Sequence, residues 1–104
     1  MAEKVVTSKA KVFILHIDND YLVRPATLII PPGEEVTFKN LTEAAATLLF
    51  PKELFNGEVL PIAAGGKATV KFGTKTGAYP YTAVVPSSAR IALGNSAPIV
   101  IIDP

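Results

Sequence analysis

Alternation of apolar and polar residues over short segments restricts the fold of this chain more than any other feature. In residues 34–39, Val36 and Phe38 lie on one side of an extended segment and polar side chains on the other, and residues 67–72 repeat the pattern. A side-chain repeat of two is the geometry of a strand with one buried face. Further apolar segments are expected to be strands that are covered on both sides or too short to show a period: residues 12–17, 26–30, 47–50 and 98–102.

Turn-forming residues separate these segments, among them the Pro-Pro-Gly of residues 31–33 and the pairs Asn56-Gly57 and Gly65-Gly66. Nine prolines and seven glycines leave little room for a long helix. The alanine-rich residues 42–47 are predicted to form a loop, because a strand follows them directly. We therefore predict an all-β fold, an antiparallel Greek-key β-sandwich of seven to eight strands, in one domain over residues 1–104.

Composition excludes several classes of function. The 104 residues include no cysteine, which rules out disulfides, thiolate catalysis and cysteine-ligated metals. The net charge of +1, without a cluster of basic residues, argues against binding to nucleic acid or to an anionic membrane. No segment is long and apolar enough to span a bilayer, and the first residues lack the apolar core of a signal peptide.

Three segments, in order, carry a family resemblance: PATLIIPPGEEVTFKN at residues 25–40, LPIAAGGKATVKF at residues 60–72 and GAYPYTAVVPSSARIALG at residues 77–94. With the closing strand at residues 99–102, they resemble the cupredoxins, the plastocyanin-like copper proteins. The resemblance implies a cupredoxin-like sandwich and a periplasmic or extracellular location.

The same resemblance implies where the copper ligands of the family would lie. The first histidine of the family lies in the loop after residue 40 and matches Ala46, with Ala45 as a second possibility. In the third segment, the cysteine matches Ala83, the second histidine Ser88 and the methionine Leu93. A type-one copper site needs a thiolate, two imidazoles and a weak axial ligand. Three of the four residues have no donor atom in the side chain and a serine hydroxyl is a poor one, so we expect no metal and no cofactor here.

The single histidine, His16, lies near Asp18 and Asp20 and offers one alternative. The three side chains could bind a cation, although hard cations usually take more oxygen ligands. A strand histidine followed by a turn explains the same residues. No nucleophile and base share a motif, so we expect no enzymatic activity.

The leading hypothesis is a metal-free module for protein interaction or a structural domain, with an unidentified protein partner. Four residues of the third segment would form an apolar docking surface: Pro86, Ala89, Ile91 and Leu93. The same side chains could instead fill the space that copper occupies in the family. Two further alternatives stay open, a metal-binding or electron-transfer protein with non-standard ligands and an engineered or decayed scaffold without copper.

Overall fold

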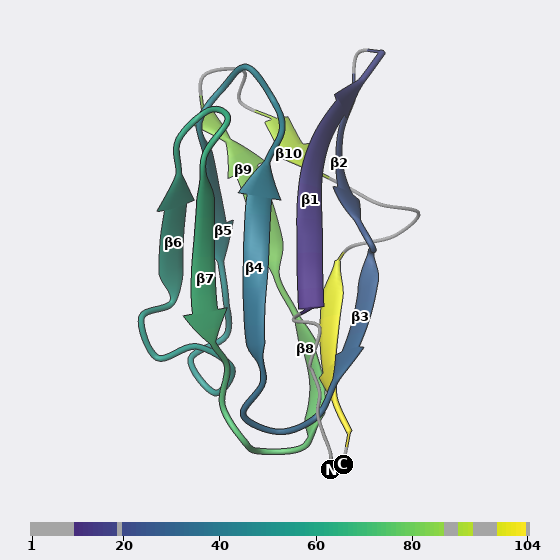
Figure 1. The fold of residues 1–104 in the computed structure, drawn as a ribbon, viewed down its shortest axis with the longest axis vertical. Coiled ribbons are helices and arrows are strands. Elements are labelled where there is room, and N and C mark those ends of the chain that lie inside the picture. Colours follow the sequence, from purple (N-terminus) through teal and green to yellow (C-terminus); the bar gives the residue numbers. More distant parts are fainter. Residues whose placement is uncertain (1–9, 19, 87–89, 93–97, 104) are drawn as a thin grey trace, which may run out of the picture.

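The structure, a computed structural model, describes residues 10–18, 20–86, 90–92 and 98–103, and in these ranges it contains strands and no α-helix (Figure 1). The strands are β1 (Ala10–Ile17), β2 (Asp20–Arg24), β3 (Thr27–Ile30), β4 (Glu35–Asn40), β5 (Ala46–Leu49), β6 (Val59–Ile62), β7 (Lys67–Lys71), β8 (Gly77–Pro80), β9 (Thr82–Val85), β10 (Arg90–Ala92) and β11 (Ile99–Ile102).

The strands form two layers. The front layer is the sheet β2-β1-β4-β7, and the back layer consists of the sheets β10-β9-β5-β6 and β3-β11-β8 (Figure 1). The two back sheets share one continuous segment, because Tyr81 alone separates β8 from β9. The chain passes from the front to the back layer between β2 and β3, at Pro25 and Ala26.

The predicted all-β sandwich is confirmed, with finer divisions than expected. Most neighbouring strands are antiparallel, but β1 pairs with β4 and β3 pairs with β11 in parallel. Parallel strands cannot be joined by a tight turn, because the chain must return to the end at which the first strand began. Both parallel pairs are accordingly joined through other strands. The described residues form eleven strands, because the segment around Tyr81 divides into two and because β2 and β10 are strands in segments where we predicted none.

The core lies between the layers. Val36, Phe38, Val70 and Phe72, which alternation places on inner faces, are all buried. Phe38, Phe50, Phe72 and Tyr81 meet there in tilted and edge-to-face contacts, with ring centroids 5.2 to 6.1 Å apart. Such contacts favour a single arrangement of the rings.

The more continuously apolar segments are not covered on both sides. Their inner side chains, such as Ile30 and Leu48, are buried, but Ile29 and Leu49 on the outer side of the back layer are 64% and 42% exposed. Of the two alternatives for these strands, full coverage is therefore wrong, because no third layer formed by the described residues covers this face.

Candidate functional site

Four connections meet at one end of the sandwich, which we call the loop end: β1–β2, β4–β5, β6–β7 and β9–β10 (Figure 1, upper end). All four connections follow strands that run toward this end: β1 is parallel to β4, and β6 and β9 are both antiparallel to β5 (Figure 1). This is the end at which the family resemblance places the copper ligands.

Asn40, the last residue of β4, holds two of these connections together. Its side chain is fully buried, and its amide nitrogen Nδ2 donates to the carbonyl oxygens of Ala44, Ile62 and Ala63 at 2.8, 3.2 and 3.2 Å. Its backbone nitrogen donates to the Gly66 carbonyl at 2.8 Å. The loop after β4 is thereby joined to the β6–β7 turn by buried hydrogen bonds.

Thr42 completes this network inside the loop. The Asn40 oxygen Oδ1 accepts hydrogen bonds from the Thr42 backbone nitrogen at 3.0 Å and from the Thr42 hydroxyl at 2.7 Å. The hydroxyl also lies 2.8 Å from the Ala44 carbonyl. Residues 40–42 also match the acceptor triplet for N-glycosylation. In this structure the amide nitrogen of Asn40 is instead used in buried hydrogen bonds, which gives the asparagine a structural role.

A polar cluster lies beside this loop and joins it to β1 and β2. The Tyr21 hydroxyl donates to Glu43 Oε2 at 2.7 Å, and His16 Nδ1 lies 3.0 Å from Glu43 Oε1. The rings of His16 and Tyr21 stack with centroids 4.2 Å apart and an interplanar angle of 14°. The single histidine of the chain is thus paired with a carboxylate to which no local sequence pattern relates it.

The environment of Glu43 favours its charged form. The hydrogen bond from Tyr21, a backbone hydrogen bond and the contact with His16 lower the Glu43 pKa from 4.5 to about 2. The side chain remains largely in solvent, 63% exposed, so the cluster presents a negative charge at the loop end.

The two copper-ligand positions that fall in described residues are both inside the core. Ala46 is 1% exposed and Ala83 is 0% exposed. Ala83 pairs with Leu48 on the neighbouring strand, so Ala46 is its diagonal neighbour, about 7–8 Å away between Cα atoms in a typical sheet. Two methyl groups therefore occupy neighbouring positions of the core. Ala45, the second possibility for the first position, is exposed.

Ser88 and Leu93 lie outside the described residues. The structure does show that β9 continues past Ala83 to Val85 and pairs with β10, where Ala92 is opposite Ala83. The third segment of the resemblance is therefore a β-hairpin at its described positions.

A copper site of the type-one kind does not fit these residues. The chain has no cysteine to supply a thiolate and a single histidine, His16, which contacts Glu43. The side chains of Ala46 and Ala83 carry no donor atom. We derive no electron-transfer step for this chain.

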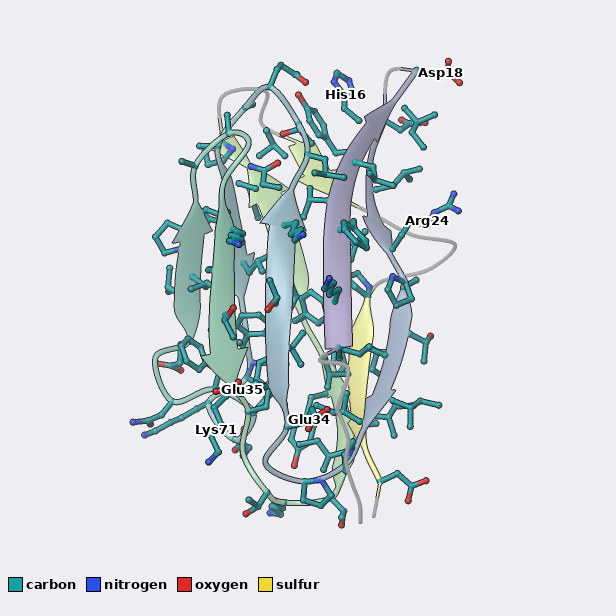
Figure 2. All side chains as sticks on the ribbon, viewed as in Figure 1. His16, Asp18, Arg24, Glu34, Glu35 and Lys71 are labelled. Atoms are coloured by element: carbon teal, nitrogen blue, oxygen red, sulfur yellow. The ribbon has the colours of Figure 1, made fainter. Side chains whose placement is uncertain are left out.

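The alternative cation site at His16, Asp18 and Asp20 is not assembled as a cluster. Figure 2 shows His16 and Asp18 on opposite sides of the β1–β2 hairpin, with Asp18 at its tip and directed into solvent. Within the described ranges, no three His, Cys, Asp or Glu side chains are placed so that they could hold a metal ion.

The predicted docking surface is only partly in the described residues. Pro86 is exposed at the loop end, Ile91 belongs to β10, and Ala89 and Leu93 lie outside the described part. Two larger exposed side chains at the same end escaped prediction: Ile17 is 46% and Leu41 is 57% exposed. Ile17 ends β1 and Leu41 directly follows β4. An apolar residue beside a turn was therefore the sequence signal that could have predicted their exposure.

Comparisons with known proteins identify the fold. No family model and no curated protein matches this chain. Among solved structures, a purple cupredoxin from Nitrosopumilus maritimus is similar with a TM-score of 0.61 and 20% identity, covering 91% of this chain and all of that one. A Cu(I) form of an amicyanin variant has a TM-score of 0.60 and 18% identity, covering 96% of this chain and 87% of the other.

A multicopper oxidase from Pseudomonas parafulva is similar over part of its length, with a TM-score of 0.62, 17% identity and coverage of 93% of this chain and 30% of the oxidase. At sequence identities this low, the structural similarity establishes the fold alone. Among the described residues, no helix is long and apolar enough to cross a membrane.

Proposed function

We propose that this chain, which has the fold of the cupredoxins, acts as a metal-free module that binds a protein partner with its loop end. The observation that carries the proposal is the exposure of Ile17, Leu41 and Pro86 at an end whose loops are held by buried hydrogen bonds. Apolar side chains left exposed at one end of a fold are typical of protein contact surfaces.

The Asn40 network supports a binding role because it orders the surface before any partner arrives. Leu41 lies between Asn40 and Thr42, and its backbone nitrogen donates to the Ile14 carbonyl at 2.9 Å. The loop is therefore attached by hydrogen bonds both to β1 and to the β6–β7 turn. A loop held in this way loses little conformational entropy on binding, which raises affinity for a given contact area.

The Glu43 carboxylate supplies a polar group at the edge of the same surface. Apolar contacts surrounded by polar groups are the usual composition of an interface that forms and dissociates. The opposite end of the sandwich is different: Figure 2 places Glu34, Glu35 and Lys71 there, and Glu35 and Lys71 are cross-strand neighbours. Of the two ends, the loop end therefore suits an apolar contact better.

A non-catalytic role and a periplasmic or extracellular location are parts of the same proposal. The first rests on the lack of a nucleophile and a base in one sequence motif, and the second rests on the family resemblance alone. The structural-domain hypothesis differs in one respect: it requires no partner at the loop end. It predicts that a charge placed at Leu41 leaves all binding unchanged.

The test begins with a photo-crosslinking amino acid at Leu41 and, as a control, at Thr69 on β7, which is also exposed. We expect a partner to crosslink from Leu41 and not from Thr69. The identified partner is then titrated against the Leu41→Lys and Thr69→Lys variants. A loss of affinity of about tenfold or more is expected for Leu41→Lys only. No crosslink from Leu41, or equal affinity for both variants, would reject the proposal.

A further inference from the structure

The outer face of the back layer carries no charged residue in any of its six longer strands. On β3, β11 and β8 the outward positions pair as Ile29–Ile101–Ala78 and Thr27–Ile99–Pro80. On β9, β5 and β6 they pair as Val84–Thr47–Pro61 and Thr82–Leu49–Val59. We call these twelve residues the apolar face. Nine are apolar and the other three are threonines.

Solvent reaches this face over its whole extent. Ile29 is 64%, Val59 53% and Leu49 42% exposed. Of the other nine residues of the face, four are exposed and five are half-buried. Ile29, Val59 and Leu49 are three of the five exposed large hydrophobic residues of the described chain, and Ile17 and Leu41 at the loop end are the other two. Exposed apolar surface of several hundred Å² is often a site of interaction.

The outer face of the front layer carries charged side chains beside the apolar Phe13, Leu15 and Leu22. Its outward positions include five basic residues, Lys11, Arg24, Lys39, Lys67 and Lys71, against two acidic ones, Asp20 and Glu35, a net charge of +3. Lys39 and Lys67 are direct cross-strand neighbours. Two copies of the chain would repel each other through this face, whereas the apolar face meets its own copy without repulsion.

We propose that the apolar face is a self-association surface and that its occupant is the same face of a second copy of this chain. A twofold arrangement brings each position against the identical surface of the partner, and sheets pack face to face through β-branched side chains about 10 Å apart. Ile29, Ile99 and Ile101 supply such side chains from two neighbouring strands. The inference goes beyond the proposed function, because it concerns a different surface and a different partner.

The size of the face sets the expected affinity. Three strands of four residues, at about 3.3 Å per residue and about 4.8 Å apart, give roughly 190 Å² of flat sheet, and the face contains two such parts. Projecting side chains raise the accessible area above this flat value, which places the contact near the lower end of specific interfaces. We therefore expect a dimer that dissociates on dilution.

Sedimentation equilibrium over a concentration series tests the proposal with the complete chain. The weight-average mass should rise from that of one chain toward twice that value as the concentration increases. Ile29→Lys and Leu49→Lys should each raise the dissociation constant at least tenfold, because the twofold axis places two lysines in one apolar contact. Leu41→Lys is the matched control, the same change at a residue that is 57% exposed at the loop end, and should dimerise like the parent chain.

Circular dichroism confirms that each variant is folded, and Ile29→Thr, which keeps a β-branched side chain, replaces Ile29→Lys if lysine prevents folding. A chain that stays monomeric at every concentration overturns the proposal, even if it binds phosphatidylcholine vesicles or another protein through this face. Dimerisation that Leu41→Lys abolishes and Ile29→Lys leaves intact overturns it as well. That second result would assign self-association to the loop end and leave the proposed function in place.

Discussion

The Tyr21 hydroxyl donates a 2.7 Å hydrogen bond to Glu43 and so joins the edge strand β2 to the loop that follows β4. The two residues are 22 positions apart in the sequence, and Tyr21 is 6% exposed while the Glu43 carboxylate faces solvent. The contact therefore couples an ordered aromatic ring to the charge state of a surface carboxylate.

Glu43→Gln should change how stability depends on pH. The Glu43 pKa is lowered to about 2 in the folded chain, so its ionised form stabilises the fold above the ordinary value of 4.5. This contribution is lost as the pH falls from about 4.5 through about 2. Urea unfolding should show a deficit of the variant at neutral pH that shrinks toward pH 2. Glu53→Gln, at the opposite end, is the control, and an equal, pH-independent deficit in Glu43→Gln would contradict the assignment.

Asn40→Ala should lower the free energy of unfolding by roughly 2–4 kcal/mol, because it leaves the Ile62 and Ala63 carbonyls and the Thr42 backbone nitrogen without their hydrogen-bond partner. Thr69→Ala removes an exposed hydroxyl, which lies 2.8 Å from the Thr37 hydroxyl, and should cost less than about 0.5 kcal/mol. Denaturant unfolding measures both. Similar losses in the two variants would show that the buried network contributes no more than a surface contact.

Tyr81→Phe and Tyr79→Phe should act in opposite directions. The Tyr81 hydroxyl is buried without a hydrogen-bond partner among the described residues, and burial raises its pKa. Its removal should stabilise the fold by about 1 kcal/mol. The Tyr79 hydroxyl donates to the Lys75 carbonyl at 2.6 Å, and its removal should cost about 1 kcal/mol. Thermal unfolding distinguishes the signs, and a loss in both variants would mean that the Tyr81 hydroxyl has a partner.

The combined variant Ala46→His, Ala83→Cys, Ser88→His and Leu93→Met should bind copper with an intense visible absorption band. Ala46 and Ala83 are buried diagonal neighbours on adjacent strands, a placement from which a histidine and a cysteine can share one ion. The parent chain, which has no thiolate, is the control and should give no such band. A folded variant that takes up no copper would show that the positions carried over by resemblance are wrong.

The inner faces of the sandwich were predictable because they follow from local alternation. Tyr79, Tyr81 and Ala83 share one parity, and all three are buried. The strand β2 was missed because it begins directly at the turn residues near Asp20. Its identity as a strand depends on pairing with β1, in which Leu22 lies opposite Leu15.

The two proposed contact surfaces were less predictable, because a sequence pattern does not show which faces of the strands stay uncovered. Apolar residues on both sides of β3 and β5 indicate that both faces favour burial, and they do not reveal whether another layer is present to cover the outer one. The contact of His16 with Glu43 joins positions 27 apart, which no local pattern relates. Distances of this kind are set by the packing of the layers.

The last strand of the sandwich, β11, occupies the middle of its sheet. It pairs with β3, more than seventy positions earlier, on one side and with β8 on the other. During synthesis β3 and β8 leave the ribosome before β11, the strand that lies between them. Their backbone groups on that side stay unpaired until Ile102 has emerged. Such late, distant pairing makes folding slow and leaves the nascent chain able to accept a foreign strand between β3 and β8.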